Sequence, residues 1–254
     1  MVVVGNCLFV ESENTKLLID AGVSLKKIEA GLETINVSPS SLNGILVTHE
    51  HSDHIQSLGN LSKKFNLPVF ANSKTFDAMP KQTDKISAEN INKFNIKEKF
   101  CINDIEITPF AIPHDAVNPC GFNISCNDDK ISIATDIGHM TNEILKQLEG
   151  SKFILLESNY DTNVLKYSKY PFTLKQRIAG PNGHLSNEMA SKVINYLIHD
   201  NLKTAMLGHL SKESNFPELA YQTVVNEIIN SGTDVSKINL SVASRDKASN
   251  LIHI

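Results

Sequence analysis

The chain has 254 residues, of which 41% are hydrophobic and 20% are charged. This length and composition are typical of a globular protein with a sizeable core, and they exclude a disordered chain. No stretch approaches the roughly 18 consecutive apolar residues of a membrane-spanning helix, so no membrane partner is expected. The formal net charge of -4 shows no overall basic surplus, which weakens a nucleic-acid function but leaves room for a local basic patch.

The cysteines favour a reducing compartment. Cys7, Cys101, Cys120 and Cys126 form no CxxC pair, so we expect free thiols in the interior of the protein. The opening stretch MVVVGNCLFVESEN lacks the basic start of a signal peptide. We therefore expect a cytoplasmic protein.

The first half of the chain alternates short apolar runs with helical periodicity. The pattern predicts strands at residues 7–12, 16–22, 44–48 and 68–72. It predicts helices over residues 24–35, with Ser24 as the N-cap, and over residues 54–65.

The second half continues the alternation. Strands are predicted at residues 105–112, 120–126, 130–136, 152–158 and 204–210, and helices at residues 140–150, 186–200 and 216–230. Residues 159–183, rich in Tyr, Lys and Pro, are expected to be irregular. This order predicts one α/β sandwich domain spanning residues 1–254.

A dense cluster of metal-ligating side chains follows the strand predicted at residues 44–48. In the string THEHSDH, His49 and His51 are two residues apart, so in extended chain both imidazoles point the same way and can reach one ion. Asp53 and His54 fall where a helix begins, and the positive helix N-terminus favours a neutral His54. The string predicts a metal site with room for a second ion, whereas a polar loop without function would seldom contain it.

The order of further Asp and His residues along the chain extends this pattern. Asp20 in LLIDAG, His114 in IPHDA, Asp136 in IATDIGH and His209 in MLGHLS each lie at or just after a predicted strand. Each residue alone is commonly a hydrogen-bonded surface residue. Together with THEHSDH, the ordered set resembles the metallo-β-lactamase fold over nearly the whole chain. The resemblance implies an αββα sandwich, in which two mixed sheets pack face to face and are covered by helices.

The resemblance also implies a set of roles for these residues. It assigns His49, His51 and His114 to one ion, Asp53, His54 and His209 to a second, and Asp136 to both. Asp20 is expected to accept a hydrogen bond from a ligand imidazole. Because the donors are nitrogen and oxygen only, the two divalent ions are expected to be Zn2+ or Mn2+, with Fe as a further option.

A second pair of residues points to proton transfer. Glu157 ends the strand predicted at residues 152–158, and His184 precedes the helix predicted at residues 186–200. If Glu157 held His184 in the charged form, the imidazole would protonate a leaving oxygen. Phosphodiesterases of the superfamily use a similar pair. The alternative is that Glu157 is an ordinary surface residue at a strand end and His184 merely a neighbour of the helix start.

Between these two residues lies a segment that is both basic and aromatic. It contains Lys166, Lys169, Lys175 and Arg177, with four aromatic residues interleaved. Cations neutralise phosphates and aromatic faces stack on bases, so these four side chains are candidate nucleic-acid contacts. The alternative is a solvated loop with a few packed rings.

The strings GNC, PHDAVNPCGF, ESNYD and YPFTLKQRIAGPNGHLSN narrow the resemblance to the YycJ/WalJ branch. Members of this branch are regarded as 5'-to-3' DNA exonucleases, although the family opens on a Gly/Ser-rich strand where this chain has MVVVGNC. The resemblance implies a binuclear metal-dependent phosphodiesterase that uses a metal-bridging hydroxide and acts on DNA, with Asp53, Glu157 and His184 catalytic. Metal identity, oligomeric state and pathway are not encoded in these patterns.

Two other functions fit the same fold. A small-molecule metallo-hydrolase would act on a thioester, a lactone or a cyclic nucleotide, and the acidic balance of the chain favours it mildly. A non-catalytic binding protein would have lost one of Asp53, Asp136 or His209, all of which are present.

Overall fold

A computed structural model describes residues 2–3, 6–198, 202–245 and 247–254. The chain divides into two compact units. The first comprises Met1–Ala111, Ala116–Cys120 and Ser244–His253, and the second comprises Ile112–Asp115 and Gly121–Ala243. The single domain over residues 1–254 stays a prediction.

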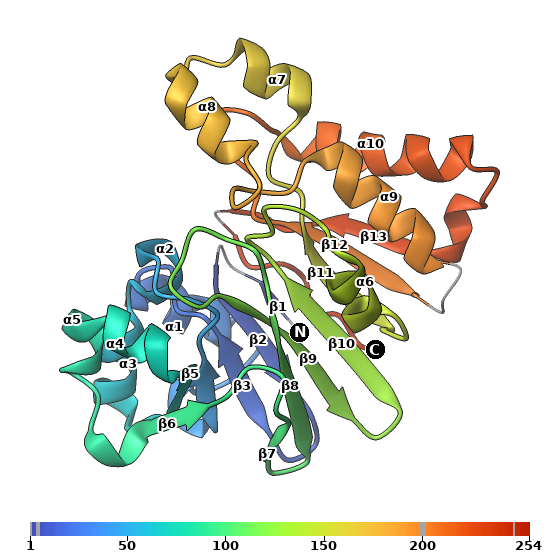
Figure 1. Cartoon of the computed structure of the whole chain (residues 1–254). Helices are drawn as coiled ribbons and strands as arrows, with labels where there is room; N and C mark the ends of the chain where they lie inside the picture. Colours follow the sequence, from blue (N-terminus) through green and yellow to red (C-terminus); the bar gives the residue numbers. More distant parts are fainter. Residues whose placement is uncertain (1, 4–5, 199–201, 246) are drawn as a thin grey trace. The chain divides into compact units, whose positions relative to one another are not determined.

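The first unit contains a six-stranded mixed sheet in the order β1-β2-β3-β4-β5-β6 (Figure 1). Its strands are β1 (Val2–Val3), β2 (Leu8–Glu11), β3 (Lys16–Ile19), β4 (Gly44–Leu46), β5 (Val69–Asn72) and β6 (Ile91–Phe94). The first three strands are antiparallel, and β3 to β6 are parallel. Strand β7 (Phe100–Ile102) pairs antiparallel with β8 (Ile105–Ala111).

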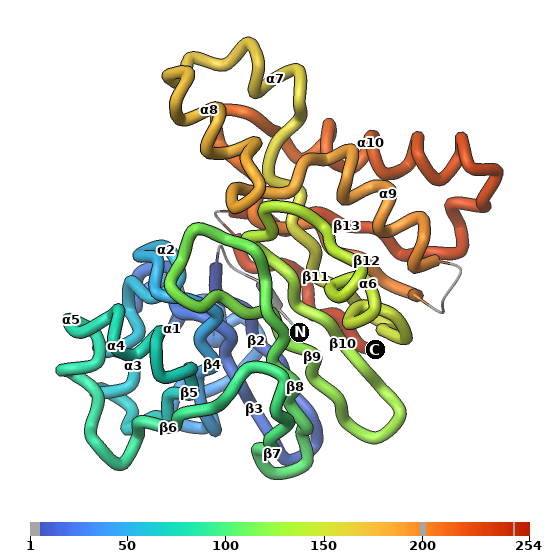
Figure 2. Tube along the Cα trace, in the orientation of Figure 1, coloured from blue at the N-terminus to red at the C-terminus, as the bar shows by residue number. Residues whose placement is uncertain are grey.

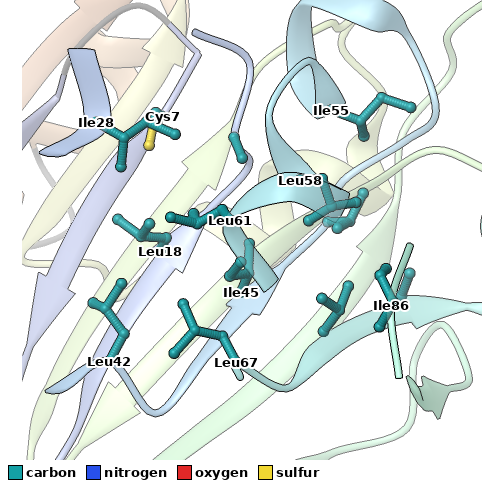
Figure 3. Close-up of a cluster of buried hydrophobic side chains, with 14 of the residues drawn as sticks. Cys7, Leu18, Ile28, Leu42, Ile45, Ile55, Leu58, Leu61, Leu67 and Ile86 are labelled. Atoms are coloured by element: carbon teal, nitrogen blue, oxygen red, sulfur yellow. The ribbon is translucent and has the colours of Figure 1, made fainter. Parts of the chain in front are cut away.

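The α-helices among the described residues of this unit are α1 (Leu25–Glu33), α2 (Ser52–Ile55), α3 (Leu58–Phe65), α4 (Ser73–Ala78) and α5 (Pro80–Thr83). The apolar face of α3 packs on the sheet, where Leu58 and Leu61 are fully buried against Ile45 of β4 and Leu18 of β3 (Figure 3). This core fixes the loop that precedes α2.

The second unit contains the strand order β13-β12-β11-β10-β9. Its elements are β9 (Cys120–Cys126), β10 (Asp129–Ala134), α6 (Asn142–Leu148), β11 (Phe153–Glu157), α7 (Thr162–Tyr167), α8 (Phe172–Ile178), α9 (Asn187–Ile198), β12 (Thr204–Gly208), α10 (Pro217–Asn230) and β13 (Asn239–Val242). Strands β10 to β13 are parallel, so their carboxyl ends share one edge. Helix α9 packs along α10 (Figure 1).

The predicted class is confirmed, since the strands form two mixed sheets with accompanying helices. Most predicted strands and helices match within a few residues, and Ser24 occupies the N-cap of α1, although its side chain makes no capping hydrogen bond. Residues 199 and 200 of the helix predicted over 186–200 lie outside the described residues. No helix in the described part of the chain has the length and hydropathy to cross a bilayer.

Two predictions were wrong. The helix expected over residues 54–65 is divided into α2 and α3, because the backbone N–H of Ser57 donates to Ala21 and its hydroxyl donates to Val23 instead of continuing a helical ladder. Residues 159–183 are not irregular. They form α7 and α8 (Figure 2), because Asp161 caps α7 and an apolar cluster buries Leu165 and Ile178.

Replacing Leu61 by Ala tests the packing beneath the loop of the first unit. The substitution leaves a cavity among fully buried neighbours, so we expect the free energy of unfolding to fall by about 2–5 kcal/mol. Leu251→Ala, at a half-exposed position, is the control and should change it by less than about 0.5 kcal/mol. Equal effects of the two substitutions in urea unfolding would contradict this packing.

Candidate metal-dependent active site

The predicted ligands of the first unit lie together in the loop between β4 and α2. His51 is the N-cap residue of α2, and Asp53 and His54 lie within this helix. The rings of His49 and His54 are 4.1 Å apart between centroids, and those of His49 and His51 are 4.6 Å apart. The structure therefore brings the three histidines of THEHSDH into one cluster.

Asp20 holds this cluster in place from the end of β3. The parallel register sets Ile19 beside Leu46, so the residues following β3 and β4 meet. One oxygen of the buried Asp20 carboxylate accepts the backbone N–H of Thr48 at 2.8 Å. The other lies 2.8 Å from the Thr48 hydroxyl and 2.7 Å from Nδ1 of His54.

These contacts decide where each imidazole carries its proton. A carboxylate can only accept, so Nδ1 of His54 donates to Asp20 and the lone pair lies on Nε2. The Thr48 hydroxyl donates to Asp20 and accepts from Nδ1 of His49 at 3.0 Å, which likewise leaves the lone pair of His49 on Nε2. Both histidines are thus fixed in the tautomer that ligates metals through Nε2.

Asn6 is a contact residue of this cluster that no sequence pattern predicts. Its side-chain Nδ2 lies 3.1 Å from Oδ2 of Asp53 and 3.0 Å from Nε2 of His54. The backbone of Gly22 also lies against this loop. A Cβ at this position would lie 1.6 Å from the carbonyl oxygen of Asp53, so only glycine fits here. The quoted strings GNC and LLIDAG contained both residues, and only the folded chain reveals what they touch.

In the second unit, the candidate residues follow the carboxyl ends of parallel strands. Glu157 ends β11 and pairs in register with Gly208, which directly precedes His209. Asp136 lies two residues beyond β10. The parallel register therefore gathers residues from three strand ends at one edge, as the sequence predicts.

Three of the candidate residues have left-handed backbone conformations. The φ angles are 60° for Asp20, 60° for Asp136 and 55° for His209. This region is unfavourable for residues other than glycine, and such strain gathers at functional sites. At a strand end it redirects the side chain away from the course of the strand.

Glu157 is the central acid of the second unit and is completely buried. Its Oε1 lies 2.8 Å from Nδ1 of His184 and 2.7 Å from Nδ1 of His209. Its Oε2 accepts the backbone N–H groups of Ile137 and Leu185 at 2.7 and 3.0 Å. The predicted pair of Glu157 and His184 is thus in contact, while the bond to His209 was not foreseen.

Electrostatics reinforce this arrangement. Burial alone would raise the pKa of Glu157, but the His184 charge and the hydrogen bonds from both histidines bring that pKa below its usual value. Burial opposes the charged form of His184, yet Glu157 outweighs it and raises the pKa of His184. The pair therefore favours a carboxylate beside an imidazolium.

His114 lies next to Asp136 but in a different electrostatic environment. Its Nδ1 donates to the carbonyl of Gly183 at 3.0 Å, and its Nε2 lies 3.6 Å from Oδ1 of Asp136. Burial lowers its pKa, which keeps the ring neutral at physiological pH. A neutral ring whose Nδ1 donates to a carbonyl presents Nε2 as a metal ligand.

The donor set fits a divalent metal. In the second unit, one nitrogen or oxygen atom each from Asp136, Glu157, His184 and His209 lies within 4.8 Å of the others, and Asp136 and His209 are the predicted ligands among them. Nδ1 of both histidines faces Glu157, which leaves Nε2 as their second functional atom. Thiolates do not compete in the first unit, because burial raises the pKa of Cys7 to about 12 and also raises that of Cys120.

The four predicted substrate cations lie on or between α7 and α8, and two of them bond within the protein. Nζ of Lys175 donates to the carbonyls of Lys166 and Ser168 at 2.8 and 2.7 Å. Nε of Arg177 donates to Asp115 at 2.6 Å, and this bond raises the pKa of Arg177. Lys166 and Lys169 are exposed.

Asp20→Asn tests whether the buried carboxylate orients its neighbours. The amide can face Nδ1 of His54 with N–H groups, which favours the wrong tautomer, so we expect zinc affinity to fall by about 10- to 100-fold. The measurement is competition for zinc with a chromogenic chelator.

Asp104→Asn is the matched control, since Asp104 also accepts hydrogen bonds from Ser12, Thr15 and Asn14. Equal zinc affinity in Asp20→Asn and the control would contradict the role of Asp20.

Comparison with known proteins supports a family assignment. Residues 15–209 match the family described as the beta-lactamase superfamily domain. The chain is 38% identical to exodeoxyribonuclease WalJ of Streptococcus pneumoniae serotype 2, with 88% of this chain and 84% of that protein covered. It is 36% identical to exodeoxyribonuclease YycJ of Bacillus anthracis, with 92% and 88% covered.

The solved structure of the metallo-beta-lactamase fold protein YhfI from Bacillus subtilis superposes with a TM-score of 0.67. It is 15% identical in sequence and covers 98% of both chains, which supports the fold alone. The chain thus belongs to the beta-lactamase superfamily, in the branch of the exodeoxyribonucleases WalJ and YycJ.

Proposed function

We propose that the protein is a metal-dependent exodeoxyribonuclease that removes nucleotides from the 5' end of DNA. Two relatives named as exodeoxyribonucleases, each more than one third identical over most of the chain, support the substrate class. The 5'-to-3' polarity rests on the resemblance to the YycJ/WalJ branch. The free cysteines agree with action in the cytoplasm.

Two Zn2+ or Mn2+ ions are part of the proposal. Their ligands would be the residues of the family pattern: His49, His51, Asp53, His54, His114, Asp136 and His209. When bound, such ions supply an activated water and neutralise charge on a phosphodiester. The residues of the chain hold the donors in place and move the proton that the leaving group needs.

The observation that carries the proposal is the shared oxygen of Glu157. A thioesterase needs no charged imidazole beside its metal ligands, because a thiolate is weakly basic and leaves without a proton. A phosphodiester releases a 3'-oxygen of high basicity, which departs faster when a proton is delivered to it. His184, held by Glu157 through Nδ1, would deliver that proton from Nε2.

Asp53 and Asp20 have different tasks in this scheme. Asp53 would ligate an ion and orient the attacking water, and Asn6 would hold its carboxylate through the 3.1 Å hydrogen bond. Asp20 would fix the rings of His49 and His54 without touching substrate. The proposed catalytic residues are therefore Asp53, Glu157 and His184.

The proposal predicts the products of a labelled strand. Protein with a measured metal content, incubated with single-stranded DNA labelled at its 3' end, should shorten the strand stepwise from the 5' end. Asp53→Ala should abolish this shortening. Loss of nucleotides from the 3' end would refute the polarity, and intact DNA and RNA strands with two ions bound per chain would refute the nuclease.

Two substrates whose leaving groups differ in basicity test whether His184 is the proton donor. His184→Ala should slow DNA hydrolysis by about 100- to 10,000-fold, because the 3'-oxygen then departs without a proton. Hydrolysis of bis(p-nitrophenyl) phosphate should fall by less than about tenfold, since p-nitrophenolate leaves without protonation.

His139→Ala is the matched control, because Nδ1 of His139 faces only the backbone carbonyl of Pro181 in the second unit. Both substrates should be hydrolysed at the wild-type rate by this variant. Equal losses on DNA and on the nitrophenyl ester in His184→Ala would show that His184 is not the acid.

A further inference from the structure

The helix pair α7–α8 has two large aromatic side chains at its tip that the proposed reaction does not use. Tyr167 is the last residue of α7 and is 78% exposed, and Phe172 is the first residue of α8 and is 73% exposed. These are the two most exposed of the large hydrophobic side chains in the described part of the chain. Their exposure needs a reason, because burial of either ring would stabilise the fold.

The same segment buries Tyr160 and partly buries Tyr170. Tyr160 is buried with Leu165 and Ile178, and Tyr170 packs against this cluster. The chain therefore offers an apolar core to the rings of this segment and leaves Tyr167 and Phe172 outside it. A segment with a few packed rings explains Tyr160 and Tyr170 but not the pair at the tip.

The charge around the two rings is of one sign. Lys166 precedes Tyr167 and places its Nζ 5.4 Å from the centroid of that ring. Lys169 is exposed in the connection between the helices. The single acidic residue of the segment 160–178 is Asp161, which caps α7 and is buried, so the segment itself adds no exposed carboxylate beside the two rings.

The support beneath the rings is ordered. Asp161 accepts the backbone N–H groups of Asn163 and Val164, both at 2.9 Å. Lys175 extends from α8 to the carbonyls of Lys166 and Ser168, which ties the end of α7 to α8. Lys175 is thus a structural residue of the tip. Rings on such a support lose little conformational entropy when a ligand binds.

The helix pair is also joined at its base to the proposed proton donor. After β11, which ends at Glu157, the chain passes through α7 and α8 and then enters α9, which begins three residues after His184 (Figure 2). Backbone hydrogen bonds from Asn159 to Leu185 and from Asn187 to Tyr160 close the base at 2.8 Å each. A ligand bound at the tip is therefore held by the same chain segment, residues 158–183, that connects Glu157 to His184.

We propose that Tyr167 and Phe172 form a stacking platform for the bases of single-stranded DNA, with Lys166 and Lys169 as its phosphate contacts. The charge complementarity selects this occupant, because exposed rings with Lys166 and Lys169 beside them suit a polyanion that carries flat bases. The inference rests on the proposed nuclease function and deepens it, since it assigns strand binding to the tip of α7–α8 and removes Lys175 and Arg177 from the set of predicted contacts.

Tyrosine fluorescence provides a direct measurement, because the protein contains five tyrosines and no tryptophan. Metal-loaded protein is titrated with a phosphorothioate oligothymidine, which resists hydrolysis, and with an abasic strand of equal length. Stacking on Tyr167 should quench part of the emission with the first strand and not with the second. Tyr167→Phe should keep the affinity and lose that part of the quench.

Two double variants measure the affinity. Tyr167→Ala/Phe172→Ala should bind the oligothymidine at least ~10-fold more weakly, since each stacked base contributes a factor of roughly 5 to 150. Ile229→Ala, at an exposed apolar position on α10, is the control and should bind like wild type.

The plot of log affinity against log salt concentration has a negative slope. Lys166→Gln/Lys169→Gln should make this slope shallower by about 1.4, because each lost phosphate contact accounts for about 0.7. Lys146→Gln/Lys192→Gln, on exposed positions of α6 and α9, removes the same charge and should leave the slope unchanged.

The failures of the two proposals can be told apart. Hydrolysis of bis(p-nitrophenyl) phosphate should be unchanged in all of these variants, because the ester is too small to reach a stacking platform. If wild type hydrolyses DNA and the aromatic double variant binds and cleaves it equally well, the platform is refuted while the nuclease stands. If the double variant instead loses self-association in sedimentation and keeps DNA binding, the tip contacts a second copy of the chain and the platform is likewise refuted.

Discussion

Two buried carboxylates determine the chemistry of the candidate active site by accepting protons from neighbouring imidazoles. Asp20 accepts from His54 directly and from His49 through the hydroxyl of Thr48. Glu157 faces Nδ1 of His184 and His209 with a single oxygen. Each acid thereby leaves Nε2 of its partners for another contact, which at His54 includes the amide of Asn6. The sheets, the helices and the loop geometry serve to hold these carboxylates where water does not reach them.

The cost of this arrangement is visible in the backbone. Asp20, Asp136 and His209 follow strand ends in a left-handed conformation that L-residues disfavour by about 1–2 kcal/mol each. The surrounding packing offsets this cost, as the close approach of Gly22 to the carbonyl of Asp53 illustrates. Burial of a carboxylate is also unfavourable unless donors surround it. Glu157 meets that requirement with two backbone N–H groups and two imidazoles.

The sequence predicted much of this site because strand ends and ligand types can be read from local patterns. The strings THEHSDH, LLIDAG and IATDIGH set each candidate at the end of an apolar run, and the class of two mixed sheets with helices is confirmed. What escaped prediction depends on tertiary contacts. Asn6 lies far in sequence from His54, and no local pattern announces that its amide meets that ring. The hydrogen bond between Glu157 and His209 follows from the register of β11 with β12. That register cannot be read from local patterns in one sequence.

The helices between Glu157 and His184 also depend on tertiary contacts that local sequence patterns do not reveal. Its Pro, Lys and Tyr content favoured an irregular loop, because short helices leave little periodicity to detect. The helices form since Asp161 caps one of them and Lys175 binds the carbonyls at its end. These contacts show that Lys175 stabilises the fold, whereas Lys166 and Lys169 are exposed to solvent. Composition alone does not distinguish among the basic residues of this segment.

The central claim is that the fold sets the histidine tautomers before any metal binds. Long-range 1H–15N NMR spectra of metal-free, 15N-labelled protein report which ring nitrogen carries the proton, and single His→Gln variants assign the signals. The account predicts that neutral His49, His54 and His114 carry the proton on Nδ1. A proton on Nε2 of His54, beside an intact Asp20, would contradict it.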